Sequence, residues 1–199
     1  NFSPPALRTA VTEKTICSSV KFSGIGLHSG KKVTMTLTPA PVSTGYVFRI
    51  SNNKHTFKIN ASFNNVKSTQ LCTTLSDSNG NTISTVEHIL SALYGLDIDN
   101  VFIDLDNNEV PVNDGSSKKF VEEIEKVGTS QQDSFKQYVK ILKPVEVREG
   151  EKIARVLPFN YTMVSTEINY MNKVIGKQSI SVILNKDIYK TQICEARTF

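Results

Sequence analysis

Glu87 and His88 are adjacent in the stretch ISTVEHILSALYG, residues 83–95, and this pair is the best candidate for chemistry in the chain. A carboxylate beside a metal-bound water can take up its proton, and a neutral imidazole is a common metal ligand. The partial positive charge at a helix N-terminus disfavours a protonated imidazole and favours an ionised carboxylate. If residues 83–95 form a helix, the pair therefore suits a metal centre that activates water.

The same two residues also fit non-catalytic roles. Ser84 and Glu87 have the spacing of a capping box, in which Ser84 is the N-cap and the Glu87 side chain bonds back to its amide. A single histidine on a helix is often structural, since a catalytic zinc needs about three protein ligands. The pattern H-E-x-x-H, which places two ligands on one helix, does not occur in the sequence. The residues alone leave the structural and the catalytic interpretations of this pair open.

The remaining polar candidates each have a simpler structural explanation. His28 lies in SGIGLHSGKK, which resembles a phosphate-binding loop only loosely and is better explained as a β-turn. His55 lies in a polar stretch, where we expect it to be solvated. Asp114 precedes a glycine and a predicted helix, a pattern typical of a turn followed by an N-cap. Cys72, in QLCTTL, is expected to be a small buried residue rather than a nucleophile.

Hydrophobic spacing predicts the elements that would position these residues. Within 83–95, four apolar residues share one helical face, and they are Val86, Ile89, Leu90 and Leu93. We expect this helix to end at Gly95, and a second helix over 118–128 to end at Gly128. Alternating or apolar runs predict strands within residues 31–40, 44–50, 72–84, 100–106, 138–150, 153–159, 161–170 and 178–185.

The order of these elements predicts an α+β fold, because strands are grouped beside helices instead of alternating regularly with them. The small polar stretch TSQQDS, residues 129–134, is the best candidate for a linker. We therefore expect an N-terminal α+β domain over residues 1–130, which carries the Glu-His pair, and a second α+β domain over residues 131–199. No helix is predicted to cover the strands of the second domain, so we expect that domain to be incomplete.

Composition argues against other classes of protein. A hydrophobic fraction of 39% and a charged fraction of 21% fit a soluble globular chain. No apolar run approaches the roughly 20 residues of a membrane-spanning helix, and the first residues lack the apolar core of a signal peptide. The net charge of +4 is small and no basic run is interleaved with aromatic residues, so we expect no nucleic-acid binding. Three widely separated cysteines fit a reducing compartment.

Four segments together resemble one enzyme family: GIGLHSGKKVTMTLTPAP, QLCTTL, ISTVEHILSALYGLDIDNVFIDLDNNEVPVNDGSSKKFVEEI and EARTF. They occur in the order and approximate spacing of the bacterial zinc-dependent UDP-3-O-acyl-N-acetylglucosamine deacetylases, and the resemblance runs from about Thr15 to Phe199. It implies two α+β domains with the helices packed between the sheets and the active site between the domains. The implied reaction hydrolyses the N-acetyl amide of a UDP-linked, 3-O-acylated glucosamine. It releases acetate in the committed step toward lipid A in Gram-negative bacteria.

The resemblance also implies roles for individual residues. His88 matches a zinc ligand, and Glu87 matches the general base that acts on the zinc-bound water. Zinc would lower the pKa of that water toward neutrality and polarise the acetyl carbonyl. Thr198 matches a threonine that stabilises the oxyanion of the tetrahedral intermediate. Cys72 and Phe199 match positions that line the substrate pocket.

The family also has residues without counterparts in this sequence. Its other zinc ligands lie on a later H-K-x-x-D helix and its implied general acid is a later histidine, whereas this sequence ends at Phe199. We therefore expect a C-terminally truncated fragment that binds zinc weakly and has no deacetylase activity. The alternative is a non-catalytic relative that binds a UDP-sugar. For the full-length protein we expect a cytoplasmic monomer that works transiently near the inner membrane. His28 and Asp114 match family motif positions to which we assign no role.

Overall fold

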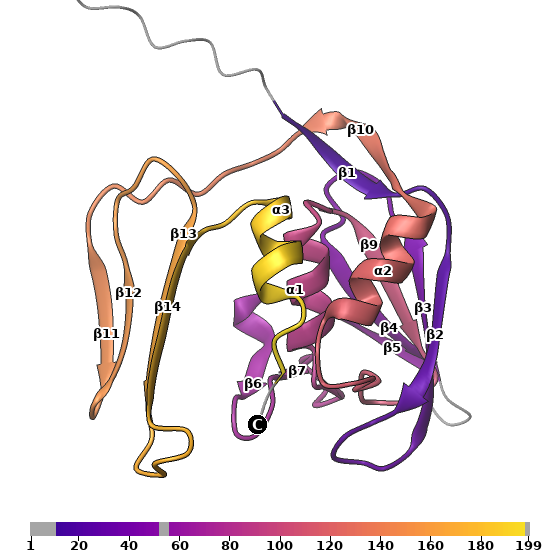
Figure 1. Cartoon of the computed structure of the whole chain (residues 1–199). Coiled ribbons are helices and arrows are strands. Elements are labelled where there is room, and N and C mark those ends of the chain that lie inside the picture. Colours follow the sequence, from indigo (N-terminus) through magenta and orange to yellow (C-terminus); the bar gives the residue numbers. More distant parts are fainter. Residues whose placement is uncertain (1–10, 52–55, 198–199) are drawn as a thin grey trace, which may run out of the picture. The chain divides into compact units, whose positions relative to one another are not determined.

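The computed structural model describes residues 11–51 and 56–197 of the chain (Figure 1). These residues form two compact units, of which the first contains the chain through Lys136 and again from Lys190, and the second contains Gln137–Tyr189. Both units contain strands, and the described helices are few. The predicted α+β fold class is therefore confirmed, while the domain limits 1–130 and 131–199 and the packing of helices between two sheets stay predictions.

The elements of the first unit are β1 (Thr12–Ile16), β2 (Val20–Ile25), β3 (Lys32–Pro39), β4 (Tyr46–Ser51), β5 (Thr56–Asn60), a 3₁₀ turn (Phe63–Asn65), β6 (Val66–Ser68), β7 (Thr74–Ser76), β8 (Thr82–Ser84), α1 (Glu87–Gly95), β9 (Val101–Leu105), α2 (Lys118–Val127) and β10 (Thr129–Phe135). Those of the second unit are β11 (Val145–Glu149), β12 (Lys152–Val156), β13 (Met163–Asn169), β14 (Lys177–Ile183) and α3 (Lys186–Ile188). A π-helical turn (Tyr189–Ile193) follows α3, and all of it but Tyr189 belongs to the first unit.

A five-stranded sheet with strand order β2-β3-β9-β4-β5 is the largest element of the first unit. Neighbouring strands are antiparallel except β4 and β9, which are parallel. The register gathers the buried apolar side chains of the strands on one face, as in the cross-strand pair of Phe22 and Met35. The opposite face is polar, and there Arg49 forms an ion pair with Asp104. Helices are therefore needed to cover only the apolar face of this sheet.

Helices α1 and α2 lie side by side against this apolar face (Figure 1). Ile89 and Leu93 of α1 are buried as their spacing predicts, whereas Leu90 is half-buried. Phe120 of α2 meets Phe22 of β2 edge-on, with ring centroids 5.1 Å apart. Burying a side chain of this size contributes about 1.5–3 kcal/mol, so this contact helps to fix α2 on the sheet.

The stretch TSQQDS is part of a strand and not the predicted linker. It lies within β10, which pairs antiparallel with β1. Small polar residues favour a linker on composition alone, and pairing with a strand from the start of the chain overrides that preference. Gly95 is the last residue of α1, so the helix ends there as predicted. Asp97 takes the left-handed conformation that turns the chain, with φ 63°.

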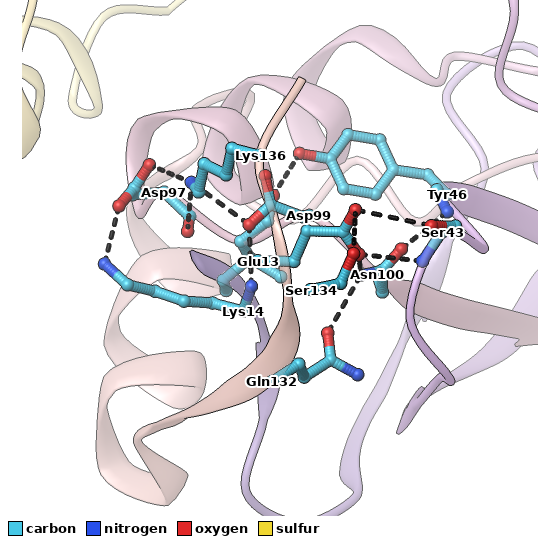
Figure 2. Close-up of polar contacts among 12 residues, drawn as sticks. Glu13, Lys14, Ser43, Tyr46, Asp97, Asp99, Asn100, Gln132, Ser134 and Lys136 are labelled. Atoms are coloured by element: carbon cyan, nitrogen blue, oxygen red, sulfur yellow. Dashed lines mark hydrogen bonds and ion pairs between the residues drawn. The ribbon is translucent and has the colours of Figure 1, made fainter. Parts of the chain in front are cut away.

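A polar network joins β1 to the residues that follow α1 (Figure 2). The Glu13 carboxylate of β1 accepts the backbone N–H of Ser43 and the side-chain amide of Asn100, both at 2.7 Å. The same amide donates to Gln132 of β10 at 2.8 Å. The network therefore stabilises the C-terminal end of α1, opposite to the end that carries the Glu-His pair.

Lys136 completes this network at the end of the first unit (Figure 2). Its side chain is 7% exposed, and its ammonium group pairs with Asp97 and Asp99. Burial opposes protonation of this amine, but the hydrogen bonds from its ammonium group to the two carboxylates outweigh burial and raise the pKa of Lys136. Lys136 therefore carries a positive charge at the junction between β10 and the second unit.

The second unit contains two antiparallel hairpins, β11 with β12 and β13 with β14. These strands match the ranges that the sequence predicts, except that β12 and β14 each begin one residue earlier. Residues 138–144, which were also expected to be extended, contain no strand, and residues 186–193 form a short helical segment that was not predicted. Within residues 11–51 and 56–197, no helix is long and apolar enough to span a bilayer.

Candidate active site at the start of helix α1

Glu87 and His88 are the first two residues of α1. Val86 occupies the N-cap position, and no side chain caps the helix. Ser84 is instead the last residue of β8, and both its amide, at 3.0 Å, and its hydroxyl, at 3.3 Å, donate to the carbonyl oxygen of Asn108. The predicted capping box is therefore wrong, because the strand continues through Ser84 and the helix begins later.

Thr85 makes the turn between β8 and α1. It is buried and has φ 59°, a left-handed conformation that is rare for a β-branched residue. Such strain persists only where the surrounding contacts hold it in place. The direction of the first turn of α1 therefore depends on the contacts of Thr85.

The Glu87 carboxylate faces the segment QLCTTL. It is half-buried and accepts the backbone N–H of Thr73 at 3.2 Å. The carbonyl oxygen of Thr73 in turn accepts the N–H of Val86 at 3.5 Å. Cys72 is the residue before Thr73, and it is half-buried, with its Sγ 3.7 Å from the hydroxyl oxygen of Thr74. The fold thus brings the segment that contains Cys72 next to Glu87, although the two are distant in sequence.

His88 is half-buried, and its carbonyl oxygen accepts the hydroxyl of Ser117 at 3.0 Å. Ser117 precedes α2, so this bond joins the beginnings of the two helices. The part of the chain that the structure describes contains no cluster of three or more His, Cys, Asp and Glu side chains able to hold a metal ion. His88 is therefore one candidate ligand, and the described residues do not complete a zinc site around it.

Glu109 is a buried carboxylate beside the residues that precede α1, and it is only 4% exposed. It accepts the backbone N–H groups of His28 and Ser29, both at 2.8 Å, and the hydroxyl of Thr85 at 3.1 Å. Burial alone would raise the pKa of Glu109, but these hydrogen bonds outweigh burial and hold the pKa below its ordinary value of 4.5. The carboxylate is therefore ionised at neutral pH and links the His28 loop to the start of α1.

Asp114 lies in the turn before α2, as the sequence predicts. Its carboxylate accepts the hydroxyl of Ser116 at 2.8 Å and the guanidinium of Arg197 at 3.1 Å. The Ser116 hydroxyl, with a smaller contribution from Arg197, holds the pKa of Asp114 below its ordinary value. In the same region the backbone N–H of Ser117 donates to the carbonyl oxygen of Cys194 at 3.0 Å. The EARTF segment is therefore attached to the loop that begins α2.

Comparison with known proteins identifies the family. The family described as LpxC, UDP-3-O-acyl N-acetylglycosamine deacetylase, matches residues 13–199. The chain belongs to this family. The resemblance inferred from the sequence is thereby confirmed, and the matched range includes every site residue that the sequence predicts.

Curated relatives of this LpxC-family chain are named UDP-3-O-acyl-N-acetylglucosamine deacetylase. One from Legionella pneumophila (strain Corby) is 40% identical over 191 residues, which cover 95% of this chain and 62% of that protein. Relatives from Pseudoalteromonas atlantica (strain T6c) and Pseudomonas entomophila (strain L48) are 39% and 41% identical, over 95% of this chain and 63% of each relative. The chain therefore spans less than two thirds of the length of these relatives.

The fold brings together Glu87, His88 and the segment of Cys72 in this LpxC-family chain. Thr198 and Phe199, which were also predicted to belong to the site, lie outside the described residues, as does His55. Their roles stay predictions.

Two contributors were not found from the sequence. Thr73 acts through its backbone, which no side-chain pattern reveals. Glu109 lies in the stretch NNEVPVNDGSS, whose composition is that of a polar loop, although it stands next to the apolar run Val110–Val112. A single acidic residue beside an apolar run was the available signal of a buried carboxylate.

Proposed function

We propose that this chain carries part of the active site of a zinc-dependent deacetylase. The reaction hydrolyses the N-acetyl amide of UDP-3-O-acyl-N-acetylglucosamine and releases acetate, as the committed step of lipid A biosynthesis. Family membership supports the reaction class. The observation that carries the proposal is the position of Glu87 and His88 at the start of α1, where Glu87 faces Thr73 and caps nothing.

Glu87 is the proposed general base. Its side chain lies in the first turn of α1. An ionised carboxylate offers about four acceptor sites, and the Thr73 N–H at 3.2 Å holds the group while leaving sites for a water proton. A positioned base of this kind contributes about 10²–10⁴-fold to the rate of proton transfer.

His88 is the proposed zinc ligand from this chain. The residues in the described ranges supply no complete ligand set, whereas a catalytic zinc takes about three protein ligands. The other ligands would have to come from residues outside these ranges. We also propose, for this reason, that residues 1–199 alone bind zinc weakly and have no deacetylase activity.

Thr198 is the proposed donor to the oxyanion of the tetrahedral intermediate, and Phe199 a proposed substrate contact. Support comes from the residue before them, because Arg197 is held by an ion pair to Asp114 at 3.1 Å. Cys72 is the other proposed substrate contact. Its neighbour Thr73 bonds to the proposed base, which supports a position at the edge of the site.

The proposed partner is the UDP-linked, acylated glucosamine itself. We propose that the enzyme acts as a cytoplasmic monomer close to the inner membrane, because its substrate carries a lipid chain. Cys17, Cys72 and Cys194 are all free thiols, which fits a reducing compartment.

The test is to measure bound zinc and acetate release for the protein at the length its gene encodes. Wild type should hold zinc and release acetate, and His88→Ala should lose both. His55→Ala, the substitution of a histidine that the sequence predicts to be solvated, serves as the matched control and should retain both. A zinc-free wild type without acetate release would refute the proposal, and UDP-sugar binding without turnover would favour a non-catalytic relative.

A further inference from the structure

Glu109 is fixed to the start of α1 by its main chain as well as by its side chain. Ser84 and Glu109 form a parallel bridge. In this bridge the N–H of Val110 donates to the carbonyl oxygen of Ser84 at 3.1 Å. The carboxylate then reaches the hydroxyl of Thr85, the next residue, at 3.1 Å. The two residues that lead into the N-cap of α1 are therefore both held by Glu109 or its neighbour.

The loop that carries His28 is shaped around the same carboxylate. A Cβ atom at Gly26 would lie 2.3 Å from Oε2 of Glu109, so any larger residue there would displace this carboxylate. The N–H of Gly30 donates to the carbonyl oxygen of Gly26 at 3.0 Å and closes the turn. This glycine-rich loop therefore presents its N–H groups to an anion as a phosphate loop does, but the anion is the carboxylate of the chain's own Glu109.

We propose that Glu109 is a positioning residue of the active site, because it locks the His28 loop to Thr85 and so sets where Glu87 and His88 begin α1. Its contact with Thr85 matters because a left-handed conformation of a β-branched residue costs about 1–3 kcal/mol and is kept only by its surroundings. Without the bond, Thr85 relaxes and the first turn of α1 moves relative to the loop. A displacement of about 1 Å in an active site can lower turnover about a hundredfold.

The expected effect on turnover rests on the proposed function, whereas the contacts by which Glu109 joins the His28 loop to Thr85 do not depend on it. Glu13 provides a matched control, because it is also a buried carboxylate held by a backbone N–H, here that of Ser43 at 2.7 Å. Glu13 lies in the network at the other end of α1 (Figure 2). Replacing either glutamate by glutamine keeps its size and removes its charge, so both variants should lower the melting temperature.

The experiment compares Glu109→Gln with Glu13→Gln in the protein at the length its gene encodes. Glu109→Gln should lower kcat about a hundredfold with KM unchanged, and Glu13→Gln should leave kcat unchanged. Hydrogen–deuterium exchange should become faster in residues 26–30 and 85–90 of Glu109→Gln but not of Glu13→Gln. Thr85→Val, which removes a single bond, should show the same changes to a smaller degree and remains informative if Glu109→Gln does not fold.

Equal losses of kcat in Glu109→Gln and Glu13→Gln would overturn the proposal, because destabilisation alone would then explain both. Unchanged exchange in residues 85–90 of Glu109→Gln would also overturn it. If the wild type releases no acetate, the proposed function fails while the exchange measurement still decides whether Glu109 locks the loop to α1.

Discussion

The backbone N–H of Thr73 donates to the carboxylate of Glu87 at 3.2 Å and joins two segments that are 14 positions apart. This bond decides how the Glu-His pair is interpreted. A carboxylate that closed a capping box would be occupied by its own backbone, whereas this one points toward the segment that contains Cys72. A structural bond and a catalytic role are therefore compatible at Glu87.

Replacement of Ser84 by alanine tests whether a capping box exists. We expect the free energy of unfolding to change by less than about 0.5 kcal/mol, because the hydroxyl makes only a long hydrogen bond of 3.3 Å to the carbonyl oxygen of Asn108. Loss of a true N-cap side chain costs about 1 kcal/mol, and that loss is expected for Asn185→Ala, because the Asn185 side chain accepts the N–H of Ile188 at 2.9 Å. Urea denaturation compares the two variants. Equal destabilisation by Ser84→Ala and Asn185→Ala would support the capping-box interpretation of Ser84 and Glu87.

Replacement of Lys136 by methionine removes the cation that lies between two carboxylates. We expect a loss of about 2 kcal/mol in the free energy of unfolding, because hydrogen bonds between charged groups are lost and Asp97 and Asp99 then repel each other. Lys126→Met is the control, since the pair that Lys126 forms with Glu123 within α2 is exposed. Urea denaturation should show a clear difference between the variants, and similar midpoints would contradict the assigned role of Lys136.

Acid should destabilise the first unit through its buried glutamates. The pKa values of Glu109 and Glu13 are both lowered from 4.5 in the folded chain. Between the folded and the unfolded pKa the unfolded state binds more protons, so stability rises with pH in that window. The contribution of these two carboxylates to the free energy of unfolding is complete above about pH 4.5, and it is lost as the pH falls through the folded pKa. Urea titrations between pH 7 and pH 3 measure how the free energy of unfolding falls with pH. This fall should be smaller for Glu109→Gln and Glu13→Gln than for wild type, and an equal fall in all three proteins would contradict this.

Local patterns predicted some of the strands whose burial alternates along the chain, although they missed β2 (Val20–Ile25), whose burial also alternates. The strand within residues 31–40 is an example, because Val33, Met35 and Leu37 are buried while the threonines between them are not. The ends of elements were less predictable. Thr85 adopts a left-handed conformation that its β-branched side chain disfavours, and the sequence around it did not predict that turn.

Residues of the candidate site could be proposed from the sequence where their own side chains are typical of catalysis or metal binding. Glu87 and His88 met that condition, and family segments supplied the rest of the interpretation. The role of Glu109 was not predictable in this way, because it depends on contacts with His28 and Thr85, which lie far from Glu109 in sequence. The strand β10 escaped prediction for the same reason, since its partner β1 opens the described chain.

Replacement of Glu87 by glutamine tests the central claim most directly. The amide keeps the size of the side chain and can still accept the N–H of Thr73, but it cannot take a proton from water. Zinc content and melting temperature should match wild type while acetate release falls about 10²–10⁴-fold. Unchanged acetate release at full zinc content would contradict the assignment of Glu87 as the general base.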